Sequence, residues 1–300
     1  MQELTDLKDK FKTVLVCLLF TSICFGQAKK DTSYCERSWC TFPKDHPAHF
    51  DPYYNGHLCE NFDPGQTDFS KEYFDLQTKR FATTTDQFPQ SVKYDFSSTW
   101  LTGETEQNGV IGLNYQRIEF HIDKVARSKN KPGTYIIAGK SKVKDNICNF
   151  SGELTLLKLY YFPACDDTSF RKCGELFGSY TFYEDSSQQH SGVFRGIMEC
   201  SVYLDSSHKR ILLDQSSSVA DGYWNRTFIG TWTDYKTKQS KKCIWGDYRL
   251  PFVFDFMCGD GEMRACDKYV MNGWQSFNDK TEYIEVAEGK WELKDKWWLK

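Results

Sequence analysis

The sequence predicts a mainly β protein, built on an antiparallel curved sheet, a barrel or a sandwich. Aromatic side chains, which are enriched in strands, make up 16% of the 300 residues. Short apolar runs alternate with polar residues at a period of two, as in half-buried strands. No long stretch has the apolar period of an amphipathic helix. These observations together favour strands over helices.

Residues 1–26 are predicted to be a signal peptide. Lysines precede an apolar run at residues 13–25, which has the length of a signal-peptide core and is too short to span a bilayer. The small residues Cys24 and Gly26 permit cleavage before Gln27. Acidic residues within the basic end leave a retained membrane anchor as the alternative. After cleavage we expect no membrane span, because no later segment is long and apolar enough.

Residues 27–95 are predicted to form an irregular, loop-rich region. They hold five of the eight prolines and few apolar residues at any regular period. Cys35, Cys40 and Cys59 also lie here, and Cys35 and Cys40 are candidates for disulfide bonds that pin the loops.

Residues 96–300 are predicted to form an antiparallel β domain. In residues 115–125, Ile118, Phe120 and Ile122 share one face and polar residues occupy the other, which indicates a half-buried strand with a solvated polar face. Turn residues separate the further strands, and two sub-sheets divided near residue 215 are an open alternative. Those strands are expected at residues 135–139, 153–162, 178–185, 192–205, 228–233 and around 243–245, before a hairpin at 282–300 that turns near Glu288 and Gly289.

Glycines recur beside large rings in several of these strands. Phe150 is followed by Gly152, Phe194 by Gly196, and Phe228 by Gly230. We expect each glycine to let a strand bend or a neighbouring backbone approach closely. This pattern is typical of successive hairpins in one curved sheet or barrel.

Ten cysteines follow the leader, an even number that predicts disulfides in an exported chain. Cys165 and Cys173 have the same spacing as Cys258 and Cys266, and each pair is predicted to close a small loop. Zinc thiolate sites are the alternative, but they need close Cys-x2-Cys spacings, which the sequence lacks.

Two short motifs in residues 228–252 resemble those of lipocalins, secreted barrels that hold small apolar ligands. They are Gly230-Thr231-Trp232 and Thr233-Asp234-Tyr235. In that family the first motif lies near the domain start and the second far downstream, whereas here they are adjacent. We therefore reject membership and interpret the stretch as a core strand.

The segment "CIWGDYRLP", together with "CFGQ" at the end of the leader, is similar to uncharacterised secreted proteins of Bacteroidetes-type bacteria. The resemblance covers the leader and roughly residues 175–275. It implies an exported bacterial protein, secreted or periplasmic, and it implies no activity.

Seven of the nine tryptophans lie between Trp224 and Trp298. Sugar faces stack on exposed aromatic rings, and rings beside turn residues are the best candidates for such a site. Tyr223, Trp224, Tyr248 and Trp274 meet that condition. The alternative is that these rings fill the core of the C-terminal half.

Metal ligands and catalytic carboxylates have weaker signals. His46, His49 and His57 could bind zinc, and the oxygen-rich loop around Asp260 and Glu262 could bind calcium, although an ordinary docked loop also explains the histidines. No cofactor is otherwise expected. Asp260 and Glu262 are the pair that we nominate for acid–base chemistry, which in glycosidases needs two carboxyls across a cleft.

The charge balance excludes one class of partner. Lys and Arg total 38 against 41 Asp and Glu, so the net charge is -3, and nothing favours nucleic acid as a partner. Common nucleophile and phosphate-binding motifs are absent. We therefore expect a secreted, disulfide-stabilised protein that binds a glycan, an extracellular or periplasmic protein, or another surface ligand without catalysis. A carboxylate-dependent, glycosidase-like hydrolase and a purely structural envelope or interaction protein are the alternatives.

Overall fold

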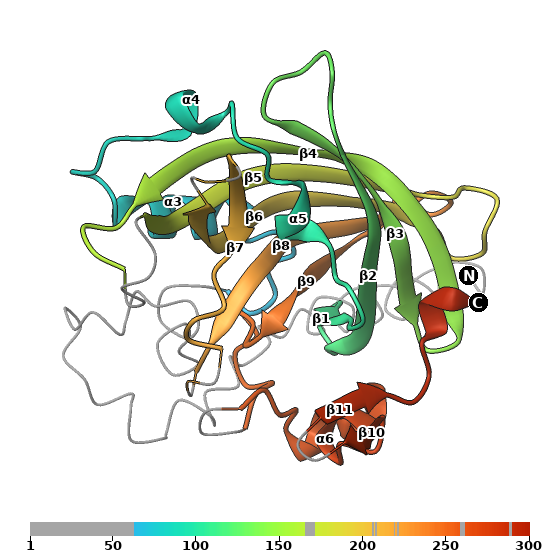
Figure 1. Ribbon diagram of the computed structural model, residues 1–300. Coiled ribbons are helices and arrows are strands. Elements are labelled where there is room, and N and C mark those ends of the chain that lie inside the picture. Colours follow the sequence, from blue (N-terminus) through green and yellow to red (C-terminus); the bar gives the residue numbers. More distant parts are fainter. Residues whose placement is uncertain are drawn as a thin grey trace, which may run out of the picture.

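Eight antiparallel strands close into a barrel in the computed structural model (Figure 1). The structure describes residues 63–165, 172–205, 207, 209–218, 220, 222–258, 262–287 and 290–300. The barrel strands are β1 (Gln107–Ile111), β2 (Gln116–Arg127), β3 (Thr134–Val143), β4 (Asn146–Tyr161), β5 (Cys173–Glu184), β6 (Gly192–Asp205), β8 (Trp224–Asp234) and β9 (Ser240–Tyr248).

The strands follow one another around the barrel in chain order. β9 pairs with β1, and β5 pairs with β6, so the sheet is closed. The prediction of a mainly β, antiparallel fold is confirmed, and of its three forms the barrel is the one observed. The alternative of two sub-sheets divided near residue 215 is not observed, because β6 and β8 on either side of that position pair directly.

Short elements surround the barrel, and Figure 1 places α6 and the β10–β11 hairpin beneath β1 and β2. They are β7 (Arg210–Leu213), which pairs with β6, the hairpin strands β10 (Tyr283–Ala287) and β11 (Lys290–Leu293), the α-helices α3 (Ser70–Lys79), α4 (Phe88–Ser91), α5 (Ser97–Trp100) and α6 (Gln275–Asn278), and the 3-10 helices η3 (Asp267–Asn272) and η4 (Trp297–Leu299). The predicted final hairpin is therefore present. Helix α3 was not expected, since residues 27–95 lack a helical apolar period.

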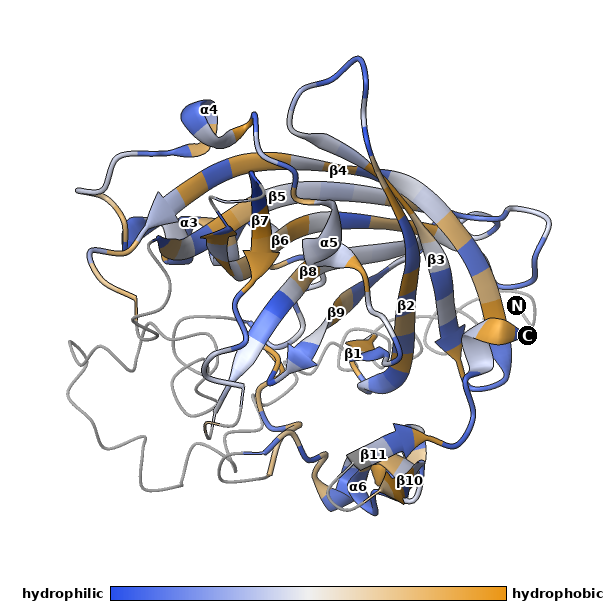
Figure 2. Ribbon diagram, in the orientation of Figure 1, coloured by the Kyte–Doolittle hydropathy of each residue, from blue (hydrophilic) through white to orange (hydrophobic). Residues whose placement is uncertain are grey.

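Aromatic rings fill the barrel interior. Ile118, Phe120 and Ile122 of β2 point inward, as their alternation predicted, and Figure 2 shows the alternation as bands along β2 and β4. Phe120 stacks on Trp245 with ring centroids 4.0 Å apart, and Trp245 stacks on Phe228 at 4.7 Å. An eight-stranded barrel is just wide enough for its own side chains to fill it or for one small ligand. Phe120 of β2 also contacts Phe194 of β6, on the opposite side of the barrel, with ring centroids 5.1 Å apart, which indicates the first arrangement.

Inward-facing glycines make this close packing of strands and rings possible. A Cβ added at Gly152 would lie 2.0 Å from the carbonyl oxygen of Thr181, and one at Gly196 2.0 Å from that of Ile229. The predicted reason for the glycine pattern is confirmed: neighbouring backbones approach where a side chain would collide.

Much of the outer face of the barrel is also buried. Residues 249–257 and the start of α3 pack on outward apolar residues of β1, β8 and β9, including Val110, Ile229 and Ile244. The C-terminal segment, residues 274–300, covers the outward side of β2, where Arg117, Glu119 and His121 are buried. The expected solvated face of β2 is therefore wrong, because a distant part of the chain folds over it.

Both predicted small disulfide loops are present. Cys165 is bonded to Cys173, and Cys258 to Cys266, with Cα–Cα distances of 5.6 and 4.9 Å. Within the described ranges, three cysteines remain as buried thiols: Cys148, Cys200 and Cys243. Cys35 and Cys40 lie outside the described residues, as do the predicted signal peptide and its alternative anchor. None of the helices that the structure describes is long and apolar enough to cross a membrane.

Candidate functional site

Three of the four nominated aromatic rings come together where β8 begins and β9 ends. Trp224 pairs with Tyr248 in the β8–β9 ladder. The rings of Tyr223 and Tyr248 lie edge to face, with centroids 5.1 Å apart. Tyr248 is 54% exposed, while Tyr223 and Trp224 are partly buried. We call these three residues the aromatic platform.

The backbone under the platform is irregular in a specific way. A bulge interrupts the β8–β9 ladder between Asn225 and Phe228. Arg226 and Tyr248 both have positive φ, 39° and 64°, a region that non-glycine residues seldom occupy. Bulges re-aim side chains at sheet edges and binding sites, and strained residues persist only where the surroundings hold them. Here they turn the Tyr248 ring toward solvent.

A buried ion pair holds the bulge in place. The Arg226 guanidinium donates to both carboxylate oxygens of Asp247, at 2.7 and 3.0 Å, and to the carbonyl of Leu101 at 2.7 Å. Gln107 donates to Asp247 at 3.1 Å. Two-point pairing of this kind fixes direction as well as distance. The platform therefore rests on a rigid base.

A second network fixes the Tyr223 ring. The Asn225 amide donates to the Tyr223 hydroxyl at 3.0 Å and to the carbonyl of Asp214 at 2.7 Å. The Tyr223 hydroxyl donates to that same carbonyl at 3.2 Å. Burial raises the pKa of Tyr223 to about 12, so the phenol stays neutral at physiological pH. With both networks in place, the two tyrosine rings keep one relative orientation.

The fourth nominated ring, Trp274, is fully buried and cannot stack on a ligand at the surface. Its indole donates to the carbonyl of Tyr115 at 2.8 Å, and its ring packs against Phe256 and Phe277. The alternative interpretation, a core ring, holds for this residue. Trp274 was nominated because it lies beside turn residues. Those residues do not show that the C-terminal segment packs on the barrel and covers the ring.

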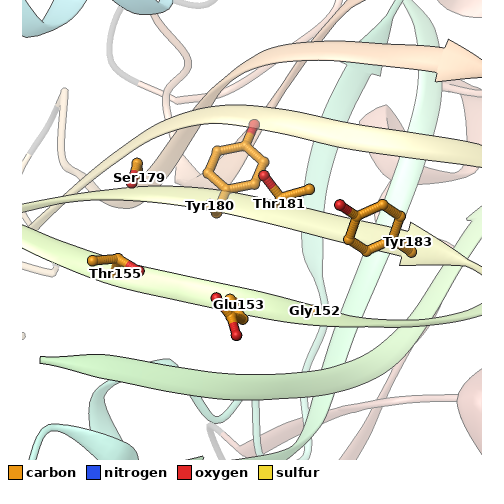
Figure 3. A pocket seen from close by; sticks show the side chains of 7 residues that line it. All are labelled: Gly152, Glu153, Thr155, Ser179, Tyr180, Thr181 and Tyr183. Carbon is orange, nitrogen blue, oxygen red and sulfur yellow. The ribbon is translucent and has the colours of Figure 1, made fainter. Parts of the chain in front are cut away.

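A second surface feature was not found from the sequence. A groove of about 420 Å³ runs over the outer side of β4 and β5 (Figure 3). Polar side chains of both strands and Tyr183, which is 49% exposed, line it. The lining residues are Gly152, Glu153, Thr155, Ser179, Tyr180, Thr181 and Tyr183. Alternation in residues 178–185 does place Ser179, Thr181 and Tyr183 on one face, which was the available signal.

Glu262, one of the two nominated catalytic carboxylates, lies in the described part. Its side chain is 74% exposed, with one oxygen 3.5 Å from the Lys280 ammonium. Glycosidase chemistry needs a carboxyl that faces a partner across a cleft, whereas this one projects into solvent beside a lysine. Asp260 lies outside the described residues, so the separation of the pair stays untested.

The metal predictions are untested at their main site. His46, His49 and His57 lie outside the described residues. Among the residues that the structure does describe, no group of three or more His, Cys, Asp or Glu side chains is placed to hold a metal ion. Asp255, which precedes the loop proposed for calcium, accepts a hydrogen bond from Tyr269 at 3.0 Å and pairs with Lys268.

Two other carboxylates have unusual electrostatics. Burial and the charge of Glu119 raise the pKa of Glu106 to about 7, and burial raises that of Glu175 to about 7. Such groups are candidates for functional sites. Glu106, however, accepts from the Trp297 indole at 2.6 Å and from Arg117 at 3.1 Å. Its partners show that it attaches the C-terminal segment to the barrel.

Comparison of the chain with protein-family models, with curated proteins and with solved structures finds no match.

Proposed function

We propose that this protein is a secreted, non-catalytic carbohydrate-binding protein that holds a sugar on the aromatic platform. The single observation that carries the proposal is the exposed Tyr248 ring, held at positive φ and braced edge to face by Tyr223. The apolar face of a pyranose stacks on such a ring, and neighbouring polar groups hydrogen-bond to its hydroxyls.

The packed barrel interior supports a surface site. The rings of Tyr180, Phe194 and Phe228, from three different strands, all contact Trp245. A ligand inside the barrel would have to displace rings that pack against one another. The two disulfides support export, because such bonds persist in oxidising compartments.

A glycan array with purified protein tests the proposal, followed by titration calorimetry on any sugar that binds. Tyr248→Ala removes the stacking ring, and we expect it to weaken binding at least tenfold, or about 1.4 kcal/mol. Trp291→Ala is the matched control, because Trp291 is similarly exposed, at 59%, on the separate β10–β11 hairpin. If the Tyr248→Ala variant and the parent bind the sugar with equal affinity, the proposal that the aromatic platform is the binding site is overturned.

The same preparation tests the hydrolase alternative. Incubation with each sugar that binds, followed by an assay for new reducing ends, distinguishes binding from cleavage. We expect no new reducing ends. If sugar is released, Glu262→Gln shows whether that carboxylate takes part.

A further inference from the structure

The groove on β4 and β5 has a chemistry of its own, distinct from the aromatic platform. Glu153 of β4 pairs with Thr181 of β5, and Thr181 pairs with Arg195 of β6. These three outward residues form one row across three strands. Neighbouring strands are about 4.8 Å apart, so the Cα atoms of Glu153 and Arg195 are about 10 Å apart. The Thr181 hydroxyl lies on the strand between them.

The two charged ends of this row differ in how they are neutralised. The Lys131 ammonium donates to both carboxylate oxygens of Glu153, each at 2.9 Å. Arg195 is exposed, and among the described residues its guanidinium has no carboxylate partner within ion-pair distance. Glu153, Lys131 and Arg195 together therefore carry a summed charge of +1, with the uncompensated positive charge on Arg195.

Arg195 also lies beside an exposed ring. Its guanidinium carbon is 5.9 Å from the centre of the Tyr183 ring. A guanidinium placed over an aromatic face is partly oriented while its donors remain available. Thr155, Ser179 and Thr181 add hydroxyls along the floor of the groove, where Figure 3 shows them on the two neighbouring strands.

We propose that this groove is a second binding site, specific for an acidic sugar unit that carries a carboxylate. Arg195 binds the carboxylate with two parallel hydrogen bonds, which its planar donors favour. The Tyr183 ring supports the apolar face of the sugar, and Glu153 with the floor hydroxyls binds the sugar hydroxyls. This site does not depend on the aromatic platform, so either can fail without the other.

Calorimetric titration with hexamers of galacturonate, glucuronate and mannuronate tests the site. Each hexamer is compared with its methyl ester, which has the same skeleton and no charge. We expect at least one acid to bind, its ester to bind roughly tenfold more weakly, and Arg195→Gln to abolish that difference. Tyr183→Ala should weaken the acid and the ester alike.

Two controls separate this site from general electrostatics and from the aromatic platform. Lys124→Gln removes the same charge from an exposed position on β2 and should leave affinity unchanged, and Tyr248→Ala should keep the preference for acid over ester. The proposal is overturned if no acid binds, if the ester binds equally well, or if Lys124→Gln acts like Arg195→Gln. It is also overturned if inorganic phosphate displaces the acid as effectively as free galacturonate does, since a bare anion site then suffices.

Discussion

Two buried regions of this molecule, the barrel interior and the outer face of β2 beneath the C-terminal segment, are built from opposite chemistry. The interior is made of stacked rings such as Phe120 and Trp245. The covered outer face centres on Arg117, which pairs with Glu106 at 3.1 Å and donates to Glu282 at 2.8 Å. Interior positions are buried by closure of the sheet, whereas outer positions are buried only because residues 274–300 fold over them.

This difference predicts different dependences on mutation and on pH. Apolar packing responds to lost volume and is indifferent to protonation. A buried cluster of three carboxylates, Glu106, Glu119 and Glu282, around Arg117 responds to the loss of any single partner and to pH. Four changes, from the largest expected effect to the smallest, test the comparison.

Trp245→Ala is expected to cause the largest loss. Removal of a buried tryptophan costs about 3–5 kcal/mol, and this ring contacts rings of four other strands, so we expect the upper end of that range. The measurement is the free energy of unfolding from denaturant titration. Trp291→Ala, at an exposed site, should change it by less than about 0.5 kcal/mol. Equal losses in the two variants would mean that the interior is not the main core.

Arg117→Met is expected to rank second. It leaves buried carboxylates without their cation, and breaking a buried pair in this way costs about 3–4 kcal/mol. The measurement is the same titration, at pH 8, which is above the pKa of about 7 of Glu106.

The double variant Arg117→Met/Glu106→Gln distinguishes charge from packing. If the cost arises from uncompensated charge, the second change recovers part of it, and the two effects are not additive. A double variant as unstable as the sum of both single variants would contradict the charge explanation.

The sequence predicts the interior of the barrel well because alternation is a local property. Ile118, Phe120 and Ile122 point inward because every second residue of a strand shares a face. The glycine and ring pattern likewise reports contacts between neighbouring strands. The sequence left a curved sheet, a barrel and a sandwich as alternatives. It did not show that the sheet closes, because the pairing of β9 with β1 joins segments more than 130 residues apart and leaves no local signal.

The covered regions show where local reasoning fails. Alternation shows that Arg117 and Glu119 face away from the core, but it does not show whether water or another segment lies there. For the same reason Trp274 was nominated as an exposed ring although it is buried. Tyr223, Trp224 and Tyr248 do lie together, because they stand beside turns at the ends of paired strands. Arg195 was missed because a sequence does not show whether a carboxylate lies near an exposed arginine.

The third change is a pH titration of stability. The folded-state pKa values of Glu106 and Glu175, about 7, lie above their ordinary value of 4.5. Between pH 4.5 and 7 the folded state therefore binds more protons, and the free energy of unfolding falls as pH rises. A shift from 4.5 to about 7, at about 1.4 kcal/mol per pKa unit, corresponds to about 3 kcal/mol for each group, so Glu106→Gln should reduce the fall over that window by about 3 kcal/mol. An unchanged slope would show that Glu106 does not titrate there.

Lys242 is predicted to reverse the trend above pH 7. Burial lowers its pKa from 10.5 to about 7, so between those values the unfolded state binds more protons and stability rises with pH. Its ammonium contacts the rings of Phe69, Tyr115 and Phe254 on the outer side of β9. Lys242→Met should remove this rise in stability above pH 7 and leave the fall below pH 7 unchanged. The contribution of Lys242 is thereby distinguished from that of Glu106.

The smallest expected effect is a gain in stability from Tyr180→Phe inside the barrel. The Tyr180 hydroxyl is buried and, among the described residues, has no hydrogen-bond partner, and burial raises its pKa well above 10. An unpaired buried polar group costs about 1–3 kcal/mol, and phenylalanine keeps the ring contacts with Phe228 and Trp245. We therefore expect the free energy of unfolding to increase by about 1 kcal/mol. A decrease of that size would show that the Tyr180 hydroxyl has a hydrogen-bond partner inside the barrel. The interior would then depend on polar contacts, as the covered outer face of β2 does, and not on ring packing alone.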